Sequence, residues 1–364
     1  MRFFHIPTKS LIKYHKSMKL QKIFVVTLLT MVSLCACGKQ PEPENKENAT
    51  VDFHTELQSN YLNDFFEDVN LYADGTKELS KPKGYTIEYS NPNNLLYKIE
   101  LQSDIDNRSF TARDESYTFT NLYLNTKYHY VVSSNSNIIV ENDFYTTNLA
   151  PRNIDVEGVT NFRDLGGHLT NDGKYTKQGM IYRSARFSEN GTKNSLITAK
   201  GKRTAVNELH IKSEIDLRLT SNNETGGLTK SVIDDSVQYF NVPMTFDGDV
   251  ISLNENEIRH LFDIISVKSN YPFVFHCSIG TDRTGYVAFL LNSLLEVKQE
   301  EIYRDYLFSN FGLIGGSRNA YAISSYIGYF SIFEGETLKE QVNNYLLSIG
   351  VAQTKIDSFI SIMN

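Results

Sequence analysis

One cysteine and one arginine share a short loop-like stretch, residues 276 to 285, with the sequence His-Cys-Ser-Ile-Gly-Thr-Asp-Arg-Thr-Gly. The apolar run Pro272–Phe275 precedes this stretch, and a helix-like apolar segment follows it. A loop between a buried strand and a helix directs successive backbone N–H groups inward, and the helix N-terminus adds partial positive charge there. The stretch therefore predicts a binding site for a phosphate dianion.

The side chains of this loop predict covalent chemistry on that phosphate. Arg283 can donate paired hydrogen bonds to phosphate oxygens, and glycines let the backbone bend closely around the ligand. Amide dipoles and the guanidinium should bring the pKa of the Cys277 thiol well below its ordinary value of about 8.5. We expect a thiolate that attacks phosphorus and forms a cysteinyl-phosphate. The expected phosphate-binding residues are Ser278, Ile279, Gly280, Thr281 and Gly285.

Hydrolysis also needs groups that handle protons. Thr284, next to Arg283, is expected to donate a hydrogen bond to the sulfur as it leaves phosphorus. A neutral carboxylic acid usually protonates the leaving oxygen, and Asp282 is the first candidate. Asp247 and Asp249 are its rivals, because their glycine-containing loop could close over the substrate. His276 is expected to orient the loop.

The use of cysteine narrows the alternatives. The chain has three cysteines, and Cys35 and Cys37 belong to an N-terminal segment of signal type, which leaves Cys277 without a partner for a disulfide. An inert buried cysteine is the remaining structural alternative. A metal site is disfavoured because no second Cys/His pair stands at ligand spacing, so we expect no metal and no cofactor.

These motifs resemble a known family. His276-Cys277, Gly280 and Arg283-Thr284-Gly285 match the Cys-x5-Arg signature of protein tyrosine phosphatases. Three further motifs, in the same order as in the bacterial tyrosine/dual-specificity phosphatases, are Asn161–Gly167, Tyr182–Ser184 and Ile215–Arg218 with Glu224. The resemblance covers roughly residues 152 to 364. It implies a phosphatase fold, and the family is also linked to phosphoinositide hydrolysis.

The resemblance also bears on supporting residues and on the substrate. Arg163 and Asp164 are expected to build a turn-and-sheet framework, with direct catalysis as the alternative. Asp216 and Arg218 are expected to form a structural ion pair, with a reach into the pocket as the alternative. The family also carries an aspartate at Asp282, but it often has lysine where this chain has Thr281, a change that favours phosphotyrosine over inositol phosphates. Arg186 or Lys202 could compensate for that lysine.

The N-terminus is laid out as an export signal. A basic start and the apolar stretch Ile23–Leu34 precede Leu34-Cys35-Ala36-Cys37-Gly38, which resembles a bacterial lipobox. The resemblance implies that residues 1–36 are removed and that Cys37 carries lipid, which anchors the protein to the outer face of the bacterial cell membrane. An uncleaved anchor helix is the alternative. Residues 37–56 are predicted to be a disordered tether.

Removal of residues 1–36 would change the formal net charge from −7 to −13, because that segment holds basic and no acidic side chains. Such an acidic surface argues against nucleic acid as a partner. A phosphotyrosine protein or a phosphorylated small molecule or lipid is the expected substrate.

Two folded regions are predicted after the tether. Short alternating segments between turn residues in 57–150 indicate an antiparallel β-sandwich that resembles a fibronectin type III domain, with Tyr128 as its corner tyrosine. Residues 151–364 alternate strands and helical stretches, which predicts an α/β fold with a mostly parallel sheet flanked by helices, the tyrosine phosphatase-like catalytic domain.

Three functions follow from these patterns. The leading one is a protein-tyrosine/dual-specificity phosphatase that hydrolyses phosphomonoesters through a cysteinyl-phosphate. The second is a phosphoinositide or inositol polyphosphate phosphatase. The third is a non-catalytic surface lipoprotein for binding or adhesion.

Overall fold

The computed structural model describes residues 49–364 except Asn222 and Gly248. The predicted signal, Cys37 and the tether as far as residue 48 lie outside the described residues. Residues 49–56, assigned to the tether, are structured: β1 (Ala49–Val51) pairs in parallel with β7 (Asn137–Thr146), and Thr55 caps α1 (Glu56–Asn63). The tether prediction therefore does not hold for these residues. Every helix of the described residues is too short or too polar to cross a bilayer.

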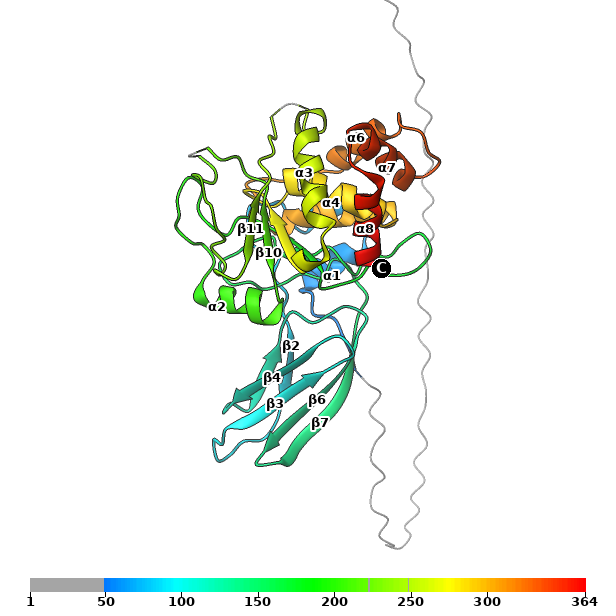
Figure 1. The fold of residues 1–364 in the computed structure, drawn as a ribbon. Helices are drawn as coiled ribbons and strands as arrows, with labels where there is room; N and C mark the ends of the chain where they lie inside the picture. The colour runs from blue at the N-terminus through cyan, green and yellow to red at the C-terminus, as the bar shows by residue number, and fades with distance from the viewer. Residues whose placement is uncertain (1–48, 222, 248) are drawn as a thin grey trace, which may run out of the picture. The chain divides into compact units, whose positions relative to one another are not determined.

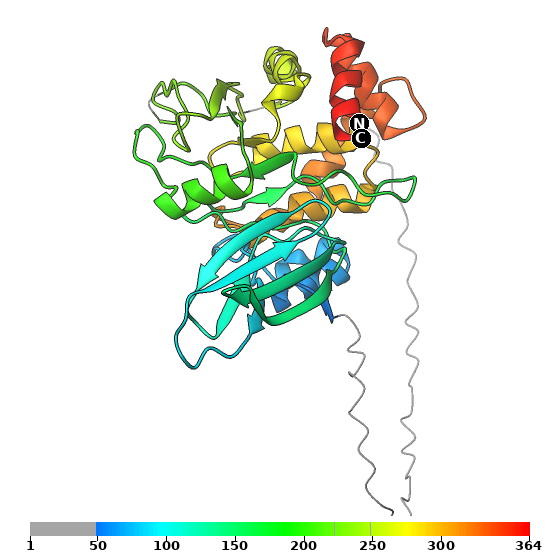
Figure 2. The same cartoon turned by 60° about the horizontal axis from the view of Figure 1, so that its bottom comes forward.

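Residues 85–146 form two β-sheets, and β1 adds an edge strand to one of them. A five-stranded sheet has the order β1-β7-β6-β3-β4, and β2 pairs with β5 in a second, antiparallel sheet. Alternate residues of β3, Tyr97, Ile99 and Leu101, are buried, as the alternating sequence predicts. They share one apolar core with Phe119 of β5, and Figure 2 shows these strands. The bounds are β2 (Tyr85–Glu88), β3 (Tyr97–Gln102), β4 (Asn107–Ala112), β5 (Ser116–Phe119) and β6 (Lys127–Ser134).

The segment from 56 to 73 does not join these sheets. The helix α1 and the 3₁₀ turn η1 (Phe66–Leu71) bury Tyr61 and Val69 in the core of the region after residue 151. The ring of Phe66 also stacks on Tyr303, with ring centroids 4.6 Å apart. The predicted start of the sandwich at residue 57 is therefore too early, because this segment presents its apolar side chains to the other core.

The region after residue 151 contains a second five-stranded sheet, of order β11-β10-β12-β9-β8. Its strands run parallel except β8, which is antiparallel to β9. All residues of β9, β10 and β12 are buried, since both faces of the sheet are covered. This confirms the predicted α/β fold. The bounds are β8 (Arg163–Asp164), β9 (Ile181–Ser184), β10 (Ser213–Asp216), β11 (Gln238–Asn241) and β12 (Phe273–His276).

Helices complete this region (Figure 1). Phe273 and Phe275 of β12 belong to the core formed with α3, α4 and the C-terminal helices, whereas Val274 belongs to the core of the segment 199–209. The α-helices are α2 (Ala199–Arg203), α3 (Glu255–Ile265), α4 (Asp282–Leu294), α5 (Gln299–Leu307), α6 (Tyr321–Phe330), α7 (Leu338–Ser348) and α8 (Gln353–Met363). Shorter helical pieces are η2 (Thr204–Glu208), η3 (Ser252–Asn254), η4 (Lys268–Asn270) and η5 (Phe308–Phe311).

Candidate active site

The loop between β12 and α4 forms the candidate site. It follows the carboxyl end of a central parallel strand and leads into α4, of which every residue after Asp282 is buried. Gly280 has φ +71°, and a Cβ at this position would lie 2.3 Å from the carbonyl oxygen of Ser184. Both the backbone angle and the lack of space require glycine. The fold thus places a helix N-terminus and its free N–H groups around the loop.

Cys277 lies at the bottom of this loop and is 2% exposed. Burial raises the pKa of its thiol, but the Arg283 guanidinium, hydrogen bonds from Thr284 and the Ile279 backbone lower it, and the net pKa lies below its ordinary value. The buried Thr284 hydroxyl has no other hydrogen-bond partner among the described residues, and its position beside Cys277 contributes to the lowered pKa of the thiol. The direction of the shift is the one that the sequence predicts.

Glu224 fixes the orientation of Arg283. The two terminal nitrogens of Arg283 lie 2.7 and 2.6 Å from the two carboxylate oxygens of Glu224, and one also donates to the carbonyl of Met244 at 3.1 Å. Burial raises the pKa of Glu224, but the hydrogen bonds from Arg283, the Leu219 N–H and Ser278, together with the charge of Arg283, lower the net pKa. Ser278 donates its hydroxyl to the same carboxylate at 3.2 Å. Sequence reasoning gave Glu224 no role, although its place in the motif after Arg218 was an available signal.

His276 connects the loop to β10. Its Nε2 lies 2.9 Å from a carboxylate oxygen of Glu214, and its Nδ1 lies 3.1 Å from the carbonyl oxygen of Cys277. Burial lowers the pKa of the imidazole, but Asp216 and Glu214 together raise it by more, so the net pKa lies above its ordinary value. In the protonated form both ring nitrogens donate, which suits both acceptors. The ring therefore holds the backbone at Cys277, and Glu214 is a partner that the sequence did not reveal.

Asp216 and Arg218 form a buried pair beside this histidine. The Arg218 Nε lies 2.9 Å from one Asp216 oxygen, and a terminal nitrogen lies 2.7 Å from the other. Glu214, Asp216 and His276 lie close enough to hold a metal ion. Each already has a partner, however, because Arg218 contacts Asp216 and His276 contacts Glu214. Protein groups thus balance the charges of this cluster.

Asn161 holds the outer side of the loop. Its side-chain amide donates to the carbonyl oxygens of Ile279 at 3.0 Å and Gly280 at 3.2 Å. Its own oxygen accepts a hydrogen bond of 2.6 Å from Arg163. Carbonyls bound from outside leave the opposite sides of their peptide planes, the N–H groups, to face the phosphate position.

Asp305 of α5 anchors this arrangement. It accepts from Arg163 at 2.8 Å and from Arg183, whose other terminal nitrogen donates to the carbonyl of Gly280 at 3.0 Å. Burial raises the pKa of Asp305, but Arg183 and Arg163 lower it well below its usual range. Arg163 thus supports the loop through its partners. Asp164 instead pairs with Arg152 at 2.8 Å, in the framework behind β8.

The three candidate proton donors lie on two segments. Asp282 begins α4, and its two oxygens contact Arg318 at 3.0 and 3.1 Å. Asp247 is exposed in the loop after β11. That loop reaches the site through Phe246, whose ring centroid lies 5.0 Å from the Arg283 guanidinium carbon. Asp249 accepts from the Ser252 hydroxyl at 2.7 Å and caps a local turn.

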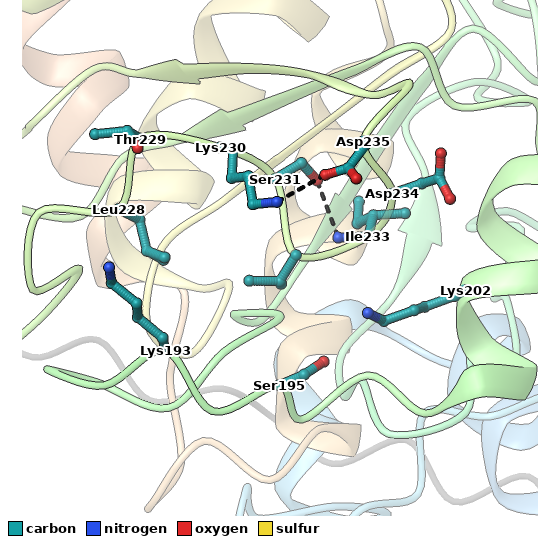
Figure 3. A pocket seen from close by; sticks show the side chains of 11 residues that line it. Lys193, Ser195, Lys202, Leu228, Thr229, Lys230, Ser231, Ile233, Asp234 and Asp235 are labelled. Atoms are coloured by element: carbon teal, nitrogen blue, oxygen red, sulfur yellow. Dashed lines mark hydrogen bonds and ion pairs between the residues drawn. The ribbon is translucent and has the colours of Figure 1, made fainter.

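The basic residues proposed to compensate for the missing loop lysine lie elsewhere. Arg186 donates to the carbonyl of Ser278 at 3.1 Å, on the outer side of the loop. Lys202 lines a separate surface pocket of about 440 Å³ (Figure 3). This pocket is linked to the site through Ser231, whose hydroxyl donates to Glu214, the partner of His276.

Two solved structures show distant similarity to part of this chain. The core catalytic domain of the PP-IP phosphatase SIW14 from S. cerevisiae, in complex with citrate, has 16% sequence identity and a TM-score of 0.29 over 40% of this chain and 76% of that chain. A structure of the Siw14 catalytic core has 14% identity and a TM-score of 0.31 over 48% of this chain and 88% of that chain. At this level of similarity neither structure bears on the substrate.

No curated protein matches the sequence. The tyrosine phosphatase family matches residues 154–327, which contain the loop and its supports Asn161, Glu224 and Asp305. The region that holds the loop and its supports therefore matches the tyrosine phosphatase family, which supports a phosphatase of the Cys-x5-Arg superfamily.

Proposed function

We propose that this protein is a protein-tyrosine/dual-specificity phosphatase that hydrolyses phosphomonoesters through a cysteinyl-phosphate. The observation that carries the proposal is the buried Cys277, whose pKa is lowered by Arg283 and Thr284. The amide dipoles of the loop stabilise a thiolate at this position. They also hold the phosphate so that its phosphorus lies in front of the sulfur.

In the first step the Cys277 sulfur attacks phosphorus in line, a sulfur–phosphorus bond forms, and the bond to the leaving oxygen breaks. Arg283 and the loop amides hold the three equatorial oxygens as their charge redistributes. Because Glu224 already orients Arg283, little reorganisation is needed when the phosphate arrives.

In the second step water attacks the cysteinyl-phosphate and the sulfur leaves as a thiolate. The Thr284 hydroxyl stabilises that thiolate by donating to it. Inorganic phosphate is released and the free enzyme is regenerated.

The leaving oxygen takes its proton from a carboxylic acid, Asp282 or Asp247. Asp282 borders Arg283 directly but is paired with Arg318, so this pair must open before Asp282 can be a neutral donor. Asp247 is exposed beside Phe246 on the loop that contacts Arg283.

Two features support phosphotyrosine as the substrate. Thr281 is fully buried and bonded to Asn161, so the loop presents no additional cation for a second phosphate of an inositol ring. The ring of Phe246 is 53% exposed above Arg283 and offers an apolar wall for an aryl group.

The test is hydrolysis of a phosphotyrosine peptide, compared with phosphoinositide vesicles, in buffer with a metal chelator. Cys277→Ser should abolish turnover and still bind phosphate, measured by calorimetry. Turnover that persists in Cys277→Ser would reject the mechanism, and faster hydrolysis of the vesicles would reject the substrate.

We also propose that the protein is an exported lipoprotein, lipidated at Cys37, with the β-sheets of residues 85–146 as a fibronectin type III-like spacer. The lipobox-like sequence supports export. In the sheets, the Tyr128 hydroxyl accepts from the Tyr123 N–H at 2.9 Å, as expected of a corner tyrosine. Labelling of growing cells with a radioactive fatty acid tests the anchor: wild type should incorporate it and Cys37→Ser should not.

A further inference from the structure

The fold fixes Arg318 next to the candidate active site. The buried Asn310 accepts a hydrogen bond of 2.7 Å from the Arg318 N–H and donates one of 2.9 Å to the Arg318 carbonyl. Both bonds involve the backbone, so the position of Arg318 does not depend on its own side chain.

The Arg318 guanidinium contacts the first residue of the catalytic helix. Its Nε and one terminal nitrogen lie 3.0 and 3.1 Å from the two oxygens of Asp282, which directly precedes Arg283. The Arg318 side chain is 29% exposed and that of Asp282 41%. A solvent-accessible ion pair is weak and can exchange partners, unlike the buried pair of Arg163 and Asp305.

The other arginines that contact the loop are engaged on its protein side. Arg183 and Arg186 donate to loop carbonyls, and Arg283 is held by Glu224. Arg318 instead holds an exposed carboxylate. The hydrogen bond with Asp282 raises the pKa of Arg318, so the guanidinium stays charged beside the first residue of α4.

We propose that Arg318 determines specificity by binding a carboxylate that the substrate carries beside its phosphotyrosine, in exchange for Asp282. The inference rests on the proposed function and names its substrate class: phosphotyrosine peptides with a neighbouring Asp or Glu. The Phe246 ring offers an apolar wall for the aryl group of phosphotyrosine. Arg318 supplies a positive charge, whereas Thr281, at the position where the family often has lysine, is uncharged and buried. In the free enzyme, Asp282 is the internal competitor for Arg318.

Substitutions of Arg318 and of Asp282 should have opposite effects on the preference for the acidic peptide. The measurement is KM for two phosphotyrosine peptides that differ only in flanking Glu or Gln, with wild type, Arg318→Ala, Arg318→Lys, Asp282→Asn and the remote control Lys230→Ala. Wild type should favour the Glu peptide by about fivefold, the upper range for an exposed charge pair. Arg318→Ala should reduce this ratio to about one, and Arg318→Lys should retain part of it. Asp282→Asn should increase the ratio, because Arg318 loses its internal partner.

A pair with only a structural role would behave differently. Because Arg318→Ala and Asp282→Asn both break the pair, both would move KM in the same direction and leave the preference for the Glu over the Gln peptide unchanged. This result would overturn the inference and leave the proposed function standing. Wild type and Arg318→Ala are also assayed on an inositol polyphosphate, and an effect of Arg318→Ala confined to that substrate would overturn the inference. If wild type hydrolyses neither peptide, the proposed function itself fails. Thermal unfolding of each variant shows whether the fold is intact.

Discussion

The side-chain amide of Asn161 lies 3.0 Å from the carbonyl oxygen of Ile279, although the two residues belong to separate motifs. Asn161 has φ 54°, a conformation that asparagine tolerates better than most residues. Its backbone and side chain therefore both suit this place, and the amide turns the loop carbonyl away from the phosphate position.

Asn161→Gly should retain the backbone conformation and remove this amide. We expect about a tenfold weaker inhibition by inorganic vanadate, because the loop N–H groups lose their fixed direction, at a cost of about 1–2 kcal/mol. The inhibition constant is the measurement. Asn94→Gly is the matched control, since Asn94 has φ 50° and is exposed in a turn near β3. Unchanged inhibition in Asn161→Gly would contradict the role of the amide.

Gly280→Ala should inactivate the enzyme and lower its stability. The added Cβ would lie 2.3 Å from the Ser184 carbonyl oxygen, and φ +71° is strained for alanine. Activity and thermal unfolding are the measurements. Gly173→Ala separates the two causes, because Gly173 has φ +81° and no atom within 4 Å of its Cβ position. Equal losses in both variants would mean that the contact with Ser184 is unimportant.

Alkylation of Cys277 should report a lowered thiol pKa. The rate of reaction with iodoacetamide, followed against pH, should reach half of its maximum below pH ~8.5, the ordinary value for a free cysteine. Thr284→Ala should move this midpoint upward, because it removes a hydrogen bond that lowers the pKa. Thr118→Ala, an exposed change in β5, should leave the midpoint in place. A midpoint at or above that of a free thiol would refute the thiolate.

Glu224→Gln should lower kcat/KM by about tenfold, since Arg283 loses a charged partner and with it a fixed orientation. Steady-state kinetics on a phosphotyrosine peptide measure the loss. The folded-state pKa of Glu224 is lowered, so its contribution to stability is present above its unfolded pKa of about 4.5 and is lost as pH falls through the folded pKa. Acid unfolding should thus begin at higher pH in Glu224→Gln than in wild type, and coincident acid transitions would argue against the pairing.

The pH dependence of kcat/KM identifies the proton donor. A general acid must be protonated, so the rate falls on the basic side as the acid ionises. The variant that loses this basic limb, Asp282→Asn or Asp247→Asn, marks the donor. Asp249→Asn is the control, because Asp249 caps the turn at Ser252. A basic limb that survives in both variants would exclude both carboxyl groups.

The predictions that held are those with local causes. The phosphate loop lies between an apolar strand and an apolar helix that adjoin it in sequence, so neighbouring residues were enough to predict it. The strand β12 and the helix α4 follow this pattern. The errors lie at the boundary of the sheets, where residues 56–73 join the other core through Tyr61 and Val69. The choice between two apolar cores depends on contacts far away in sequence, which periodicity does not contain.

The sequence by itself determined the α/β class, the phosphate loop and the place of Cys277 and Arg283 within it, because these depend on neighbours a few residues apart. Only the tertiary structure decided which distant side chains complete the loop. Glu224 reaches Arg283, Asp305 joins Arg163 to Arg183, and Arg318 contacts Asp282. The strength of an ion pair depends on the distance between the two charges, and residues far apart in sequence come close only when the sheet and its helices pack.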